Sequence, residues 1–334
     1  MSSESATFPL YNPGSIQKLP QSHEVEFPKG FIYQDNRTTL QKIIDVILAT
    51  FRNLLAVWKT FPSRIATAFN FMPYSEYCQA RDPATWNKWK GNSEGLHLLT
   101  HGFLGHPSIW NSYIDALQKK EPNSDVRVPF VPEKGNCSLE EATMPIREMV
   151  RSYLDEQISK KENTVIHISL YGVSNGARIT LNLLDGLIND ELNTRLKEKN
   201  LRLAVKVDAI AGVLLGTTNW KLRLANCSNF TNWFARNVLR VSKNILEDFN
   251  YKSEACKKLI ENVQKINKTS NIALSYHFHA STEDPQVSPC SSSLPILNKG
   301  ETFNVVHGEG HSSIVGRVKD SILTTFDDWK RLQA

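Results

Sequence analysis

The chain has 334 residues, of which 40% are hydrophobic and 22% charged, as expected for one large globular domain or two small ones. A formal net charge of +5 is too small to indicate nucleic-acid binding by itself, and no zinc-finger or RNA-binding motif accompanies it. The five cysteines form no CxxC pair, which argues against a disulfide framework or a zinc site. We therefore expect neither a metal site nor a nucleic-acid partner.

The first thirty-six residues or so are rich in Pro, Ser and Gln, and this composition predicts a loosely ordered leader. A basic segment followed by an apolar one is missing, so we expect no cleaved signal peptide. Uninterrupted apolar stretches of about 18 residues, the length that spans a membrane, are also missing. The predicted location is the cytoplasm, or outside the cell by a route without a cleaved signal, as for a secreted effector.

An amphipathic helix is predicted over 39–61, within an N-terminal extension of residues 1–90. Its apolar positions recur every three or four residues: Ile43, Ile44, Ile47, Phe51, Leu54, Leu55 and Trp58. Its opposite side carries Lys42, Asp45, Arg52, Asn53 and Lys59. Pro62 should end the helix. We expect the apolar stripe to face the core, and a helix lying on a membrane surface is the alternative.

Residues 91–334 alternate short apolar runs with amphipathic helices. The predicted strands are Leu96–Thr100, Val126–Val131, Val165–Tyr171, Ala209–Gly216, Ile272–His279 and Phe303–His307. The predicted helices include Ser108–Lys119, Ser138–Lys160 and Ala177–Leu187. Such alternation predicts the α/β class, with a mostly parallel sheet covered by helices on both faces.

The interval of about 217–271 is too long for a plain connection between two strands. Helices are predicted at Phe230–Leu246 and Ser253–Ile266. This insertion holds ten basic and four acidic residues, so its net positive charge alone exceeds the +5 of the whole chain. With its aromatic residues Trp220, Phe230, Trp233 and Phe234, the insertion could bind an anionic membrane peripherally; charges that are merely solvated are the alternative.

The segment Gly172-Val-Ser174-Asn-Gly176 matches the pattern GxSxG. An apolar strand precedes it and a helical pattern follows, so Ser174 is expected on a tight strand-to-helix turn that exposes its hydroxyl. The flanking positions must be glycine, because larger side chains would collide in such a turn. This context predicts Ser174 as a nucleophile.

The segment His101-Gly102-Phe103 ends an earlier predicted strand. Acyl transfer needs two N–H donors where negative charge develops on the substrate carbonyl oxygen. We expect these donors to be the backbone N–H groups of Phe103 and of Asn175, which follows the serine, with Gly102 permitting the required backbone conformation. His101 and His106 are interpreted as scaffolding of this loop.

An acid and a base follow the last two predicted strands, at Asp284 and His311. The order serine, acid, histidine suits a general base at His311 whose imidazole is oriented by Asp284. Glu283 and Asp208 compete as the acid, but Asp208 is placed before its predicted strand, at the wrong edge of the sheet. His307 competes as the base, and we favour His311 because it lies in a glycine-flanked loop beyond the strand.

Together these motifs resemble the α/β-hydrolase superfamily, in its lipase and esterase branch, over about residues 95–334. The resemblance implies the α/β-hydrolase fold, with the insertion as a helical lid, no metal and no organic cofactor. It implies a serine hydrolase that cleaves carboxylic, lipid-like acyl esters through an acyl-enzyme. Two alternatives stay open: an acyl thioesterase or transacylase with the same triad, and a non-catalytic module that binds lipid or a partner on a hydrolase scaffold.

Overall fold

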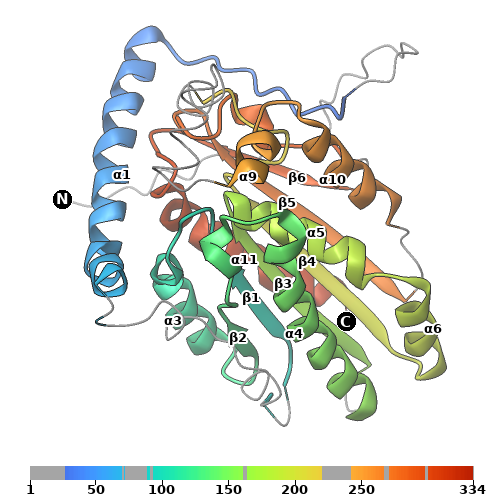
Figure 1. Ribbon diagram of the computed structural model, residues 1–334. Helices are drawn as coiled ribbons and strands as arrows, with labels where there is room; N and C mark the ends of the chain where they lie inside the picture. The colour runs from blue at the N-terminus through green and yellow to red at the C-terminus, as the bar shows by residue number, and fades with distance from the viewer. Residues whose placement is uncertain are drawn as a thin grey trace.

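The structure is a computed structural model in which a central sheet is sandwiched between helices (Figure 1). It describes residues 27–69, 71, 89–90, 93–160, 164–219, 242–266, 271–297 and 300–333.

The described strands form one six-stranded sheet in the order β2-β1-β3-β4-β5-β6, and every neighbouring pair is parallel. The strands are β1 (Leu96–Thr100), β2 (Asp125–Arg127), β3 (Val165–Val173), β4 (Arg202–Ile210), β5 (Ile272–Ser281) and β6 (Thr302–Val306). Because all strands run the same way, their carboxyl ends share one edge, where open α/β sheets place their sites. The predicted fold class is confirmed.

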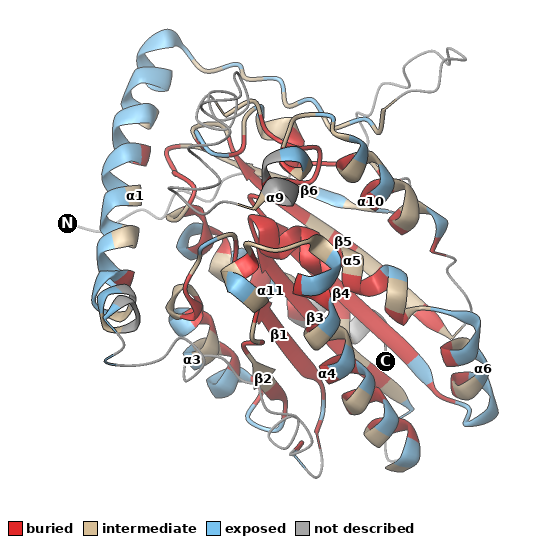
Figure 2. Cartoon of the chain, viewed as in Figure 1, coloured by how far each residue is buried: buried red, intermediate tan, exposed pale blue. Residues whose placement is uncertain are grey.

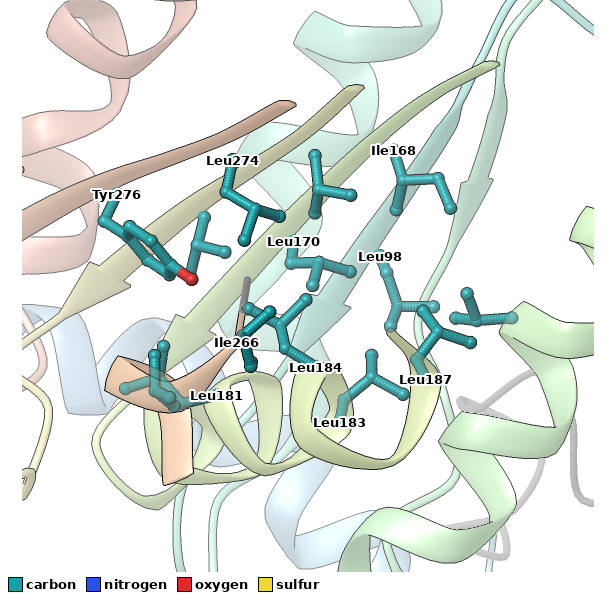
Figure 3. Close-up of a cluster of buried hydrophobic side chains, with 14 of the residues drawn as sticks. Leu98, Ile168, Leu170, Leu181, Leu183, Leu184, Leu187, Ile266, Leu274 and Tyr276 are labelled. Carbon is teal, nitrogen blue, oxygen red and sulfur yellow. The ribbon is translucent and has the colours of Figure 1, made fainter. Parts of the chain in front are cut away.

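One face of the sheet packs against helices α4 (Leu139–Lys160), α5 (Asn175–Leu187) and α10 (Glu254–Lys265). Leu98 and Leu170 from the strands meet Leu181 and Leu184 from α5, as Figure 3 shows. The two α5 leucines lie three residues apart and therefore share one side of the helix. Burial of each such leucine stabilises the fold by about 1.5–3 kcal/mol. Helix α6 (Asp190–Glu198) adds Leu192 and Leu196 to the same core.

The opposite face packs against the short 3₁₀ turn η3 (Pro107–Trp110), α3 (Asn111–Lys120) and α11 (Ile314–Gln333). Leu99 and Tyr171 belong to this second core, whereas Leu98 and Leu170 belong to the first. Successive residues of a strand point to opposite faces, so these apolar pairs supply both cores.

The fourth strand is not where the sequence places it. The prediction was Ala209–Gly216, but β4 runs over Arg202–Ile210. Lys206 and Asp208 hid the strand, because charged residues seldom lie inside a buried sheet. In the structure they pair, with 2.5 Å between the Lys206 ammonium and the Asp208 carboxylate, and both are fully buried. Asp208 therefore lies within the strand and does not precede it.

The N-terminal helix α1 spans Thr39–Ala68 and continues past Pro62, where we expected it to end. Proline removes the hydrogen bond to the carbonyl four residues earlier, at Trp58. Trp58 is 70% exposed, so this turn of the helix lies at the surface of the protein. Among the described residues, no helix is long and apolar enough to cross a membrane.

The apolar stripe of α1 also differs from the prediction. Ile47, Phe51 and Leu54 are each more than 60% exposed, so the favoured interpretation of a core-facing stripe is wrong. The helix instead turns its polar side to the protein, where Arg52 and Asn53 bond the chain around residues 308–312. These polar contacts account for its inverted orientation.

The predicted lid is described only in part. Its C-terminal helix, α10, packs against α5, and Leu259 and Ile260 belong to the core beside the sheet. A short helix, α9 (Lys243–Asp248), precedes it. Residues 220–241 lie outside the described residues. They include the aromatic residues named above and most of the first predicted helix of the insertion.

Candidate active site

Ser174 lies in the turn between β3 and α5, with φ 57° and ψ −122°. Such a conformation costs a residue with a side chain about 1–3 kcal/mol, and it persists only where the surroundings impose it. The Ser174 N–H donates to the carbonyl of Ile210 at 2.9 Å, which ties the turn to the end of β4.

Both glycines of the GxSxG pattern are required by close approach of the backbone. A Cβ atom at Gly172 would lie 2.5 Å from the carbonyl oxygen of Gly176. A Cβ atom at Gly176 would overlap the carbonyl oxygen of Thr100, at the end of β1. The predicted strand–turn–helix context of the serine is therefore present in the structure.

The loop after β1 runs directly beside the serine. A Cβ atom at Gly102 would lie 2.7 Å from the Cβ of Ser174 and 3.2 Å from its Oγ. His101 supports this loop, since its Nδ1 is 2.8 Å from the Gly102 carbonyl oxygen. The structure thus brings together the two segments, around Phe103 and Asn175, that are predicted to supply the oxyanion donors.

A second loop at this position was missed in the sequence. It is the 3₁₀ turn η4 (Pro132–Gly135), in which Glu133, Lys134 and Gly135 all have positive φ. The Leu104 N–H donates to the Lys134 carbonyl at 2.8 Å, and the Asn175 side-chain amide donates to the Gly135 carbonyl at 3.4 Å. Pro132 and Gly135, which follow the apolar residues Phe130 and Val131, are turn signals that could have revealed it.

Asp284 and His311 are joined by a hydrogen bond. Nδ1 of His311 lies 2.7 Å from Oδ2 of Asp284. The other oxygen of Asp284 accepts from the backbone N–H groups of Gln286 at 2.8 Å and Val287 at 3.2 Å. The carboxylate is therefore fixed on both sides, and Asp284 is 5% exposed.

The competing acid Glu283 has other partners. It forms a 2.7 Å ion pair with Arg37 and accepts from the Gly308 N–H at 2.7 Å. The competing base His307 lies 2.7 Å from the Thr282 hydroxyl and 3.1 Å from that of Tyr33. Burial lowers the pKa of His307. Neither rival is found in the pair that His311 and Asp284 form.

Asp208 is bonded within the sheet. Besides Lys206 it contacts His279, whose Nε2 is 3.3 Å from the Asp208 carboxylate. Burial alone would raise the pKa of Asp208, but the charge of Lys206 and the bond to His279 outweigh it and hold this pKa below its usual range. Its role is therefore structural.

Replacing Asp208 by asparagine should lower the free energy of unfolding by about 3–5 kcal/mol, because Lys206 would stay buried without its countercharge. Urea denaturation measures this loss. The double variant Lys206→Met/Asp208→Asn removes the stranded charge and should recover most of the stability. If the single variant unfolds like the wild type, the buried pair does not stabilise the sheet.

A small apolar cluster joins the loop after β1 to the loop of the acid. It consists of Val213, Ile245, Phe249 and Val287, with Phe103 packed against it. The rings of Phe103 and Phe249 meet edge to face, with 5.9 Å between their centroids. Because the Val287 N–H also donates to Asp284, this cluster lies beside the proposed catalytic acid.

Helix α1 braces the loop that carries His311. The Asn53 side-chain oxygen accepts from the Ser312 N–H at 2.7 Å, and a Cβ atom at Gly310 would lie 2.6 Å from the Asn53 Cβ. Arg52 donates to the Gly308 carbonyl and to Glu309, both at 2.9 Å. In the sequence, these residues indicate only a polar helix face.

Replacing Asn53 by alanine should lower kcat for a soluble ester about tenfold and leave KM unchanged, because small displacements of a catalytic group slow chemistry more than binding. Asn53→Asp keeps the acceptor oxygen and should restore most of kcat. Thr50→Ala, on the same helix, is the control, since the Thr50 hydroxyl donates to the Val46 carbonyl within α1 at 2.8 Å. Equal losses in Asn53→Ala and Thr50→Ala would contradict this positioning role.

The placement of the three side chains along the sheet decides the fold. Ser174 follows β3, Asp284 follows β5 and His311 follows β6, at the carboxyl edge of a parallel sheet and in the chain order typical of one superfamily. The chain has the α/β-hydrolase fold. Within the described ranges, no three His, Cys, Asp or Glu side chains gather in a way that could hold a metal ion.

No family model and no curated protein matches the chain. Among solved structures, it resembles esterase B from Lactobacillus rhamnosis at 12% identity and a TM-score of 0.45, over 86% of this chain and 97% of that one. Lipase B from Aspergillus fumigatus follows at 12% identity and a TM-score of 0.40, over 65% of this chain. The chain spans 46% of that lipase's length. Likenesses this low carry no weight for activity, which is argued below from the site itself.

Proposed function

We propose that the protein is a serine hydrolase that cleaves carboxylic acyl esters through an acyl-enzyme, with Ser174 as nucleophile. The observation that carries this proposal is the hydrogen bond of 2.7 Å between Asp284 and His311, at the same sheet edge as the strained turn of Ser174. A serine hydroxyl needs an adjacent base to attack a carbonyl, and an imidazole held by a carboxylate is such a base.

The chemistry follows from these partners. With Asp284 at Nδ1, the Nδ1–H tautomer is favoured, and Nε2 of His311 can accept the proton of Ser174. The serine oxygen bonds the acyl carbon, and the N–H groups of Phe103 and Asn175 stabilise the resulting oxyanion. The C–O bond to the alcohol then breaks, and His311 returns the proton to that alcohol. A water molecule, deprotonated by His311, releases the acid from Ser174 in the same way.

The substrate class is inferred from the apolar cluster of Phe103, Val213, Ile245, Phe249 and Val287. Its position between the two loops favours an acyl chain over a polar group next to the ester carbonyl. We therefore assign a lipid-like acyl ester. A thioesterase or transacylase would use the same triad with another leaving group or acceptor. A non-catalytic module is disfavoured, because it would have no use for the strain at Ser174.

A substrate panel tests this proposal. Short and long acyl esters, lysophospholipids, phospholipids and acyl thioesters are compared with the wild type and with Ser174→Ala. We expect release of free acid from oxygen esters, fastest for an apolar acyl chain, and its loss in the variant. A preference for thioesters would favour the second assignment, and no turnover of any member would contradict the hydrolase.

A further inference from the structure

Helix α1 is attached to the protein by its polar side. Arg52 and Asn53 bond the loop of residues 308–312, and Asp45 pairs with Arg37 at 2.5 Å. Arg37 in turn pairs with Glu283, next to Asp284. Ala49, at 3% exposed, lies on this inner side. The helix therefore rests on both loops that carry the proposed acid and base.

The other side of α1 is an apolar stripe that faces away from the protein. Ile47, Phe51, Leu54 and Trp58 lie along one line of the helix and are 63%, 61%, 63% and 70% exposed. Figure 2 shows α1 as a helix that is exposed along most of its length, at the border of the molecule. Leu40 and Ile43, at 66% and 53%, extend the stripe toward the start of the helix.

This arrangement inverts the usual one. A surface helix normally turns its apolar stripe to the core and its charges to water. A contiguous apolar surface of this length on a protein marks an interaction site. Since the polar side is used for attachment, the interaction has to involve the outward stripe.

The charges of α1 favour a lipid surface as the occupant. Asp45 is the only acid in the helix, and it is held by Arg37. Lys42 keeps 46% of its side chain exposed and Lys59 is also exposed, and long basic side chains can reach past an apolar face to lipid head groups. Trp58 stacks on Phe61 at 5.5 Å, and aromatic residues are favoured at the boundary between lipid and water.

We propose that α1 binds an anionic lipid surface through its outward stripe and thereby holds the carboxyl edge of the sheet beside that surface. The stripe lies in the membrane boundary, and Lys42 and Lys59 lie near the anionic head groups. The polar side of the same helix remains bonded to the loops of Asp284 and His311. Docking does not depend on hydrolysis, so its test is independent of the test of the proposed function.

Vesicle flotation tests this docking with the full chain carrying Ser174→Ala, so that no lipid is consumed. Neutral phosphatidylcholine vesicles are compared with vesicles that contain about one-third phosphatidylserine. We expect binding to the anionic vesicles that weakens as added salt screens the charges. Ile47→Glu and Leu54→Glu should each weaken binding about tenfold, because each places a charge in the stripe.

Met144→Glu is the matched control. Met144 is 56% exposed on α4, so the same change is made to an exposed apolar residue away from the stripe, and binding should be unaltered. If circular dichroism shows that a glutamate variant does not fold, the double variant Ile47→Ser/Leu54→Ser is used in its place. Equal flotation with both vesicle types, or equal losses in Met144→Glu and Leu54→Glu, would overturn the proposal. A wild-type dimer that the stripe variants convert to monomer, without vesicle binding, would also overturn it and assign the stripe to a second copy of the chain.

Discussion

Ester turnover should fall roughly 10⁴-fold or more when Ser174 is replaced by alanine, because the members of a catalytic triad act as a unit. The variant removes only the Oγ atom, while the strained backbone, the Gly102 loop and the Asp284–His311 pair remain. Steady-state kinetics on the best ester of the panel measures the loss in kcat. Substrate binding should be retained, since the apolar cluster beside the site is unchanged.

Ser321→Ala provides the control for this result. Ser321 is exposed on α11, so its hydroxyl can be removed without touching the site. We expect wild-type kinetics from it. Robust turnover by Ser174→Ala would refute Ser174 as the nucleophile, even if the fold and the other assignments stood.

Asp284→Asn should lower kcat by roughly 10²–10⁴-fold, through loss of control over the imidazole tautomer. Asparagine can still accept the N–H groups of Gln286 and Val287 through its amide oxygen, so the loop should keep its shape. Its amide nitrogen would face Nδ1 of His311 as a donor and favour the tautomer that cannot take the serine proton. Thermal unfolding close to that of the wild type separates this effect from a loss of structure.

Two further variants compare how much other carboxylates contribute to turnover. Glu283→Gln keeps an acceptor for the Gly308 N–H but loses the charge opposite Arg37, so turnover should fall far less than in Asp284→Asn. Asp320→Asn, at a side chain that is 92% exposed, should change nothing. If Glu283→Gln is the more damaging of the first two, the acid is Glu283 and our assignment is off by one residue.

The sequence located the strands that precede Ser174, Asp284 and His311 better than it located the fourth strand. Ser174, Asp284 and His311 each follow a strand whose start was predicted within a residue, because apolar β-strands ending in glycine-rich loops give a strong local pattern. The fourth strand was misplaced because its identity depends on a tertiary pair. Lys206 and Asp208 neutralise each other inside the protein, and a pattern of polar and apolar residues cannot show which charges are buried together.

Helix α1 was predicted as an element but not in its orientation. Periodicity locates an apolar stripe, and the usual inference turns that stripe to the core. Here the polar contacts of Arg52 and Asn53 with a loop more than 250 residues away determine which side faces the protein. The η4 loop beside Phe103 was missed because two of its three positive φ angles belong to Glu133 and Lys134, residue types that seldom adopt them, and only one belongs to a glycine.

The most direct test of a serine activated by His311 is labelling with a fluorophosphonate, which reacts with serines that have an adjacent base. The adduct is located by mass spectrometry of the digested protein, in the wild type and in His311→Ala. We predict a single labelled peptide, modified at Ser174, with labelling abolished in the histidine variant. A label on another residue, or equal labelling of Ser174 with and without His311, would contradict the account.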